Sequence, residues 1–511
     1  MKIKRESAKP LLHPIHRVLS TLGLIATGIA ITSGTASAVQ PSINGSGQVL
    51  LFPYYSVRPA GGDGGDYNTL LSIANTTAEY KALKVRFREA KTGEEVNELN
   101  VFLSPNDSWV AAVIPTTTGA RLVTNDNSCV TPADFFTAAG RDLFRPVDST
   151  TAAMDRVREG YIEVIEMGTI TSTTVQGHMA RNAALVPANC TAIGALDPAT
   201  GTAPNVFPGN FLAAPGGGLS GRVTLLNPVT GINFSYVPTA LEAWSNVVRY
   251  GGVRSGAPLL GAASPPETRT LLEDGRVLHS VWATGLEAVS AALMSDGVVN
   301  EFILDSGTNS LTDWVVTFPT YYEHFKTSAS NPYSNPSSPQ LPAGCIPSGW
   351  PTTNSESRLA MVNREEGAPG CSPNLNPTVP RLSCGVLTLN HCSVANVVAY
   401  GNRSLLNSTS QTIVSDRARS FFQAATTTAA STTSVPGQVN GPNGTAELVF
   451  DWTNTQRLAP VSSTLDGVAV SSVAILGVPV ISIGMHTYTR TGVVSTYGGV
   501  IPGTHRLKLQ F

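Results

Sequence analysis

The sequence predicts a mainly β protein, an antiparallel β-sandwich of immunoglobulin-like type with a few short helices and long Pro-, Gly- and Ser-rich loops. One basis is alternation, because apolar Leu83, Val85 and Phe87 are separated by charged residues. The other is the close spacing of turn residues, at 91–94 and 104–107. Period-two alternation between such turns is typical of antiparallel strands with one buried face. Several of these strands in succession indicate a sandwich.

Four strands are predicted between residues 68 and 115. Their apolar residues are Leu71 and Ile73, then Leu83, Val85 and Phe87, then Leu99, Val101 and Leu103, and finally Trp109, Ala111 and Val113. Successive side chains of a strand point to opposite faces of the sheet. We therefore expect Lys84, Arg86 and Arg88 on a face that contacts water.

The first 38 residues are predicted to be an export signal. A basic segment precedes the apolar residues 19–34, and Ala36-Ser37-Ala38 fits the small-x-small cleavage rule. The mature chain would then begin at Val39. A retained membrane anchor is the alternative, but the apolar stretch is shorter than the ~20 residues that a helical span needs. We therefore expect a secreted or cell-surface protein.

Charge is sparse, since only 13% of the residues are Asp, Glu, Lys or Arg. Five of the 33 basic residues and one of the 35 acidic residues precede residue 39, which leaves 28 basic and 34 acidic residues in the mature chain. Nucleic-acid binding needs a basic surface. The balance therefore argues against a nucleic-acid partner.

All six cysteines follow the predicted signal, and an even number in an exported chain favours three disulfides. Proximity along the chain suggests the pairs Cys129–Cys190, Cys345–Cys371 and Cys384–Cys392, although the sequence does not fix this connectivity. Zinc is the rival use, but the chain has no Cys-x-x-Cys motif and His391 beside Cys392 is isolated.

Ahead of the four strands, residues 49–52 predict another strand, which an Asp/Gly-rich loop at 61–66 follows. This loop is similar to one turn of a calcium-binding repeat. A calcium site is thus the alternative to a plain loop, but a single copy lacks the partner turn. We expect no cofactor.

Further elements are predicted from caps and alternation. Thr131-Pro132-Ala133-Asp134 predicts a helix to about Leu143, because it supplies an N-cap, a proline at the first helical position and an acid in the first turn. Thr284 and Glu287 form a capping box that opens another helix, with Gly297 as its expected C-cap. Strands are predicted at 161–167, at 222–226 paired with 232–236, at 314–318, at 395–400 and at 448–452, and two buried strands at 468–483.

Five regions follow from these patterns. We expect a signal at 1–38, sandwich strands at 39–130 and a continuing β-rich region with short helices at 131–326. Residues 327–394 are expected to form a Pro-rich insertion stapled by disulfides, because ten prolines between 332 and 380 exclude regular strands. Residues 395–511 would form a C-terminal β-rich region.

Three segments resemble a group of uncharacterised exported bacterial proteins that are described as cell-surface proteins. They are Leu50-Leu51-Phe52-Pro53-Tyr54-Tyr55, Thr312-Asp313-Trp314-Val315-Val316-Thr317-Phe318-Pro319 and Asn363-Arg364-Glu365-Glu366-Gly367. The resemblance implies export and a surface location. It carries no catalytic residues onto this sequence.

No catalytic motif is present in the sequence. Gly218-Leu219-Ser220-Gly221 is one residue short of a nucleophile elbow, and there is no His-Glu-x-x-His, Walker or Rossmann motif. The adjacent pairs Glu94-Glu95 and Glu365-Glu366 would point to opposite faces of a strand. We therefore expect no catalytic, cofactor-binding or metal-binding residues and no enzyme.

Aromatic pairs follow two predicted strands, Tyr54-Tyr55 and Tyr321-Tyr322. They could stack on the rings of a surface glycan, but we expect them to fill the core where a proline ends each strand.

The favoured function is a non-enzymatic exported cell-surface protein with a structural or adhesive role that self-assembles into a filament or surface layer. Homo-oligomers would form by edge-strand pairing, for which residues 39–57 are the expected strand. One alternative is a secreted hydrolase or carbohydrate-binding module. Another is an outer-membrane β-barrel, which the alternating Leu507, Leu509 and Phe511 favour but the Pro-rich tracts and few aromatic residues oppose.

Overall fold

The structure is a computed structural model of the 511-residue chain. It describes residues 38–60, 65–138, 140–147, 151–197, 209–253, 255–272, 274–303, 308, 310–327, 356–363, 386–391, 393–400, 403–413, 444–450, 457–489 and 496–511. All of these residues belong to one compact unit, which starts at Ser37.

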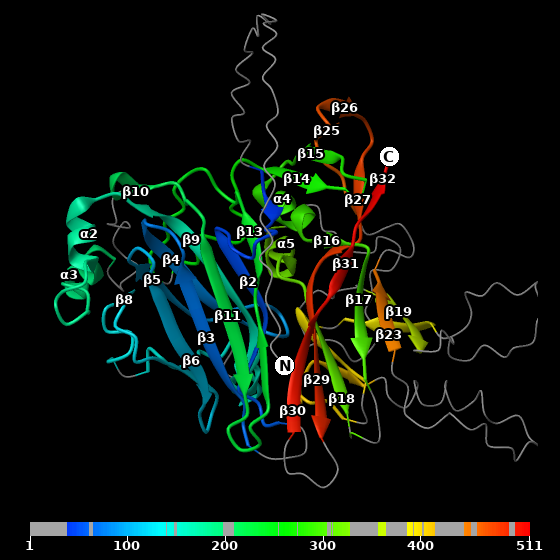
Figure 1. The fold of residues 1–511 in the computed structure, drawn as a ribbon, viewed down its shortest axis with the longest axis horizontal. Coiled ribbons are helices and arrows are strands. Elements are labelled where there is room, and N and C mark those ends of the chain that lie inside the picture. Colours follow the sequence, from blue (N-terminus) through cyan, green and yellow to red (C-terminus); the bar gives the residue numbers. More distant parts are fainter. Residues whose placement is uncertain are drawn as a thin grey trace, which may run out of the picture. The chain divides into compact units, whose positions relative to one another are not determined.

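The first sandwich consists of two antiparallel sheets, here named sheets A and B (Figure 1). Sheet A has the order β1 (Gln40–Pro41), β13 (Thr239–Glu242), β2 (Val49–Ser56), β9 (Glu159–Ile170), β4 (Tyr80–Glu89), β5 (Glu95–Leu103) and β8 (Cys129–Thr131), with β10 (Leu212–Ala213) also paired to β9. Sheet B has the order β12 (Asn233–Tyr236), β11 (Leu219–Leu226), β3 (Asn68–Asn75), β6 (Ser108–Pro115) and β7 (Ala120–Val123). The predicted antiparallel β-sandwich is therefore confirmed.

The core between sheets A and B is formed by the alternating apolar residues that the sequence displays. Val85 of β4 and Ile162 of β9 are fully buried on one side, and Ile73 of β3 and Trp109 of β6 on the other. At about 25 cal/mol for each Å² of apolar surface removed from water, this core is the main stabilising term of the fold.

A second pair of sheets, here named C and D, packs in the same way. Sheet C has the order β22 (Gln411–Ile413), β21 (Ala395–Ala399), β18 (Leu311–Thr317), β29 (Ile481–Thr489) and β30 (Thr496–Pro502). Sheet D has the order β20 (Val386–Asn390), β19 (Glu356–Asn363), β23 (Gly444–Val449), β17 (Gly297–Phe302) and β31 (Thr504–Arg506). Strands β21 and β22 are parallel.

Strand β18 is buried on both faces and joins the two cores. Trp314 and Val316 belong to the core between sheets C and D, with Leu448 and Phe302. Leu311 and Val315 point the other way and belong to the core of the first sandwich. The strong apolar character of β18 follows from this double burial.

Two smaller sheets and several short helices complete the unit. Sheet E has the order β14 (Glu267–Leu271), β15 (Val277–Val281), β25 (Ser462–Leu465) and β26 (Val468–Val470), and sheet F has the order β24 (Arg457–Leu458), β27 (Ala474–Leu476) and β32 (Lys508–Gln510). β16 (Met294–Ser295) pairs with β28 (Val478–Pro479). The helices are α1 (Thr151–Arg156), α2 (Thr173–Met179), α3 (Cys190–Leu196), η1 (Gly209–Phe211), α4 (Gly285–Ala292) and α5 (Tyr321–Thr327).

Most predicted strands are confirmed, but the two buried strands expected at 468–483 are wrong, because this stretch is divided among β26, β27, β28 and β29 and β26 is largely exposed. The capping box of α4 is confirmed, since Thr284 and Glu287 exchange side-chain and backbone hydrogen bonds. The expected C-cap at Gly297 is wrong, because α4 ends at Ala292 and the chain re-enters strands at once. The expected helix from Thr131 to Leu143 is also wrong. Phe135 and Thr137 donate to residues three positions earlier, as successive turns, and no helix forms in the described part of this segment.

The disulfide Cys129–Cys190 is confirmed, with a Cα–Cα distance of 5.0 Å. It ties the edge strand β8 to α3, which covers one end of sheet A with α2 (Figure 1). The other four cysteines, Cys345, Cys371, Cys384 and Cys392, lie outside the described residues, as does most of the predicted insertion. The expectation that the prolines exclude regular strands from this insertion is wrong, because β19 lies between Pro351 and Pro369 and pairs with β20 and β23.

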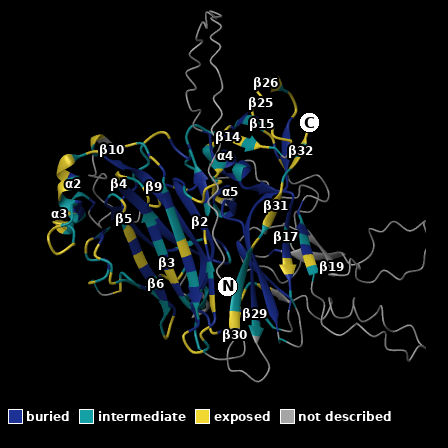
Figure 2. Cartoon of the chain, in the orientation of Figure 1, coloured by how far each residue is buried: buried dark blue, intermediate teal, exposed yellow. Residues whose placement is uncertain are grey.

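Most of the expected pairing segment at residues 39–57 is the interior strand β2, whereas Gln40 and Pro41 form β1, which ends the order of sheet A. β2 hydrogen-bonds β13 on one side and β9 on the other, and each of its residues is buried (Figure 2). The expectation is therefore wrong for β2, since this strand has a neighbouring strand on each side and is not an edge of sheet A.

Candidate functional site

The outer face of sheet A carries a buried cluster of charged side chains, here named the charge ladder: Lys84, Arg86, Arg88, Glu95, Glu98 and Glu163. In the register of the sheet, Arg86 of β4 lies between Glu98 of β5 and Glu163 of β9. Lys84 and Arg88 flank Arg86 two residues away on the same face of β4. One face of three neighbouring strands therefore brings three cations against three carboxylates.

Close ion pairs connect the members of the ladder. Arg88 Nε lies 2.7 Å from Glu163 Oε1, and Arg86 Nη1 lies 3.3 Å from Glu163 Oε2. On the other side Lys84 Nζ lies 3.3 Å from Glu98 Oε2, and Arg86 Nε lies 3.0 Å from Glu95 Oε2. Each cation therefore has at least one carboxylate partner.

A segment distant in sequence covers the ladder. This strap, defined as residues 251–253 and 255–261, turns its carbonyl groups toward the sheet. Gly252 O accepts a hydrogen bond from Lys84 Nζ at 3.0 Å, and Pro258 O accepts one from Arg86 Nη1 at 3.1 Å. The strap thus supplies further acceptors to two cations that also contact carboxylates.

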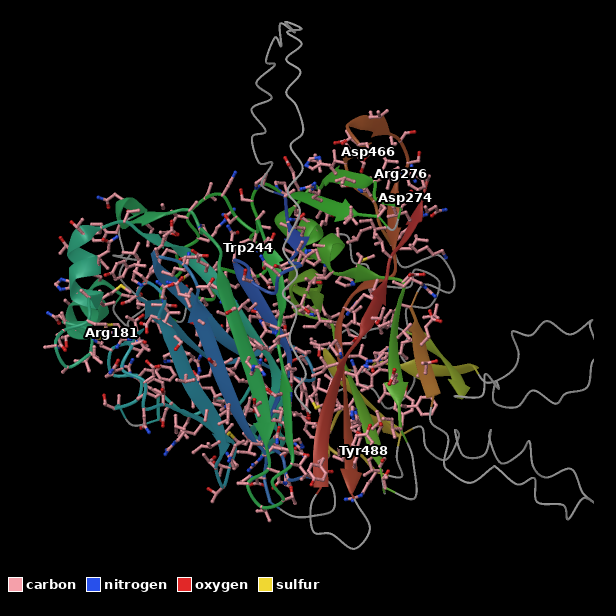
Figure 3. All side chains as sticks on the ribbon, in the orientation of Figure 1. Arg181, Trp244, Asp274, Arg276, Asp466 and Tyr488 are labelled. Carbon is pink, nitrogen blue, oxygen red and sulfur yellow. A yellow bond between two sulfur atoms is a disulfide. The ribbon has the colours of Figure 1, made fainter. Side chains whose placement is uncertain are left out.

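Helix α5 holds the far end of the strap. Glu323 Oε1 and Oε2 accept hydrogen bonds from the backbone N–H groups of Leu260 and Gly261, at 2.8 and 2.9 Å. Trp244, which is labelled in Figure 3, donates from Nε1 to Leu260 O at 2.8 Å. Gly251 is required at the near end, because a Cβ there would lie 1.9 Å from Ala257 O.

The pKa shifts follow from burial and from the partners. Burial lowers the pKa of Lys84, although Glu98 opposes this shift, and burial raises the pKa of Glu323 against the effect of Arg88. Burial also lowers the pKa of Arg88, but the neighbouring Glu163 carboxylate reverses this and raises it overall. The ladder is therefore held together by compensation of charge in a dry environment.

A second buried pair lies on the same sheet. Lys81 Nζ lies 2.9 Å from Glu166 Oε1, and the N–H groups of Gly216 and Gly217 donate to the Glu166 carboxylate at 2.9 and 2.7 Å. Burial raises the pKa of Glu166, and Lys81 opposes that shift.

The expectation that Lys84, Arg86 and Arg88 contact water is wrong. Their exposed fractions are 0%, 0% and 2%. Alternation correctly places them on one face, but the strap and α5 cover that face. The sequence signal that could have predicted this burial is the presence of Glu98 and Glu163 on the neighbouring strands, because a buried charge needs a partner of opposite sign.

The ladder has the character of a structural network rather than a reaction centre. The pocket beside it, lined by Glu98, Arg141 and Arg145 among others, has a volume of about 20 Å³, which is room for one water. A buried pair is costly to break and gives little net stability when intact. The charge ladder instead favours one arrangement of the strands and the strap, because any other arrangement would leave a buried charge without its partner.

Tyr54, Tyr55 and Tyr321 fill cores, as expected, but Tyr322 does not. Tyr54 and Tyr55 are fully buried, Tyr321 is 8% exposed, and Tyr54 OH donates to Glu159 Oε2 at 2.6 Å. Tyr322 is half-buried, with the Arg88 guanidinium 5.0 Å from its ring centroid. These tyrosines do not form a flat exposed row for a glycan.

The structure also brings together Ser290 of α4 and His324 of α5, which sequence reasoning did not connect. Ser290 Oγ lies 2.7 Å from His324 Nε2. Both residues are fully buried, so a substrate has no path to the hydroxyl. The pair links the two helices.

Among the described residues no three His, Cys, Asp or Glu side chains are grouped to hold a metal. Residues 61–64 of the proposed calcium loop lie outside the described residues.

Asp313 is a buried carboxylate at the junction of the two sandwiches. It lies on β18 and accepts hydrogen bonds from Ser404 Oγ and from the N–H of Leu406 at 2.9 Å. Burial raises its pKa to about 6, although these hydrogen bonds act in the opposite direction.

Two open hollows lie on the surface. One, of about 670 Å³, covers the outer face of sheet B and includes Leu70, Val110, Asp126 and Arg222 in its lining. The other, of about 700 Å³, lies between sheets E and F and is lined largely by Ser, Ala and Val residues, with Phe511 at the chain end.

No described helix has both the length and the apolar character needed to cross a membrane. Comparison with known proteins adds no identity, because no protein family, curated protein or solved structure matches the chain.

Proposed function

We propose that this chain is an exported cell-surface protein without enzymatic activity, which has a structural or adhesive role and self-assembles by strand addition. The observation that carries the proposal is the pair of strands at the margins of sheets E and F. β26 ends the order of sheet E and β32 ends that of sheet F. Val468 of β26 is 69% exposed, and Phe511 beside β32 is 62% exposed.

The hairpin of β25 and β26 determines which backbone groups of β26 are available. Asp466 and Gly467 form its turn with φ values of 49° and 83°, and Leu465 pairs with Val468. In a two-residue hairpin the flanking pair exchanges hydrogen bonds, so the N–H and C=O of Ala469 point away from β25. An added strand would pair with these groups.

The composition of the adjoining hollow supports an extended chain as the occupant. Small side chains line it, among them Ser463, Ala469 and Ser471. Short side chains allow a backbone to approach closely. The charge ladder also supports a structural role, because it places charged side chains in the interior, where they fix one arrangement instead of meeting a ligand.

Export and assembly are tested separately. Cleavage after Ala38 predicts that the exported protein begins at Val39, which N-terminal sequencing measures. For assembly, Ala469→Pro removes the outward donor without touching the bonds to β25, and Ala469→Ser keeps that donor. We expect light scattering and negative-stain imaging to detect assemblies for the wild type and for the Ser variant, and not for the Pro variant. Equal assembly by all three would exclude β26 as the pairing edge.

A further inference from the structure

The outer face of sheet B carries an exposed apolar patch, here named the floor, which is formed by Leu70, Val110 and Ala112. One charged residue lies at either side of it. Cross-strand register aligns Arg222 of β11, Ser72 of β3 and Val110 of β6 in one row. The next row contains Thr224, Leu70 and Ala112. Leu70 is 41% exposed and Val110 is 50% exposed, so neighbouring strands present apolar side chains to water.

Arg222 and Asp126 lie on opposite sides of this floor. Asp126 follows β7, and its carboxylate accepts hydrogen bonds from the N–H of Val110 at 3.2 Å and from that of Ser128 at 2.8 Å. Arg222 is exposed on β11, two strands from Val110 of β6, which is about 10 Å at the usual strand spacing. Arg222 Nη1 donates a long hydrogen bond of 3.4 Å to Ser235 Oγ.

We propose that two copies of this chain pair face to face through the outer faces of their B sheets. The two-fold axis lies in the plane of the interface, parallel to the strands and between β3 and β6. This rotation exchanges the two sides of the floor, so Arg222 of each copy lies over Asp126 of the other. Leu70 and Val110 of the two copies then meet at the centre.

Charge complementarity identifies the occupant as a second copy. An in-plane axis across the strands would place Arg222 over Arg222, and like charges disfavour that arrangement. The strand-parallel axis pairs opposite charges twice for one set of residues, as an isologous interface requires. An exposed apolar floor with a polar rim is typical of protein interfaces.

This inference rests on the proposed self-assembly and gives it a second contact surface, distant in sequence from β26. The experiment therefore uses the full mature chain carrying Ala469→Pro, in which strand addition is blocked. Sedimentation velocity across the micromolar range should detect dimers. A monomer throughout that range would overturn the pairing and leave strand addition unaffected.

Variants of exposed residues locate the interface without disturbing the core. Val110→Glu should weaken the dimer by roughly tenfold or more, because it places a charge at the centre of the floor. Leu271→Glu is the matched control, since Leu271 is 69% exposed on sheet E. Loss of the dimer in the control, or its survival in Val110→Glu, would overturn the proposal.

A double-mutant cycle tests the axis. Arg222→Gln and Asp126→Asn each remove one charge, and Asn keeps an acceptor for Val110 and Ser128. Direct pairing across the interface predicts that the double variant loses less affinity than the sum of the single losses. Strict additivity would overturn the proposed orientation.

Discussion

Arg88 and Glu163 form the shortest ion pair of the charge ladder, with Nε and Oε1 2.7 Å apart on neighbouring strands of sheet A. The side chains are 3% and 1% exposed. Water therefore cannot replace either partner when the other is removed, which makes this pair the most sensitive test of the ladder.

Glu163→Gln should lower the free energy of unfolding by about 3–5 kcal/mol, because the guanidinium groups of Arg86 and Arg88 lose their shared carboxylate in a dry environment. Urea unfolding followed by circular dichroism measures the loss. The control is Asp274→Asn, which breaks the exposed Asp274–Arg276 pair seen in Figure 3. Stability should barely change in the control. A similar result for Glu163→Gln would mean that water reaches the ladder.

Asp313→Asn should change how stability depends on pH. Its folded pKa of about 6 lies above its ordinary value of 3.8, so the folded state binds this proton more tightly than the unfolded state. The Asp313 contribution therefore stabilises the wild type as pH falls from about 6 to about 4, and the benefit is lost as pH rises through 6.

The Asn variant lacks this titration, so the stability difference between the two proteins should shift by about 2 kcal/mol between pH 4 and pH 7, in favour of Asn at pH 7. Urea unfolding of both proteins at matched pH values measures the difference. A constant difference would show that Asp313 titrates normally.

Cys129→Ser with Cys190→Ser should lower stability by about 4 kcal/mol, because the disulfide closes a loop with a sequence separation of 61. Thermal unfolding with and without reductant measures the loss. The wild type under reductant should approach the double variant, whereas the variant itself should not respond unless another disulfide contributes.

Gly251→Ala should displace the strap. The new Cβ would meet Ala257 O at 1.9 Å, and the shift would remove the acceptors of Lys84 and Asn100. We expect a loss of more than about 2 kcal/mol and faster hydrogen exchange in the strap. Gly177→Ala is the control, because Gly177 lies in α2 with open space around it and Ala favours a helix by up to about 1 kcal/mol.

Alternation and turn spacing were sufficient to predict the strands of the first sandwich, since those patterns record which face is apolar. They could not predict what covers the opposite face. The cover of β4 comes from the strap and from Glu323, which are far away in sequence and bear no signature of strand pairing. The same limit explains the error for β2, whose neighbours β9 and β13 follow it by more than a hundred residues.

Caps were predicted well where the signal is local, as for Thr284 and Glu287. The segment after Thr131 has a similar local cap, but there the backbone forms successive turns that place Phe135 in the core of the first sandwich, and it does not continue into a helix. The contact between Ser290 and His324 could not be predicted, because it depends on how α4 and α5 pack against each other. Local sequence patterns do not indicate that packing.

Strand β18 has a consequence for how the protein comes apart. Trp314 and Leu311 project from opposite faces of β18 into two different hydrophobic cores. Neither core can therefore open without exposing a strand that also belongs to the other core. The two sandwiches should therefore unfold as one cooperative unit. A force applied to either sandwich would be transmitted to the other through β18.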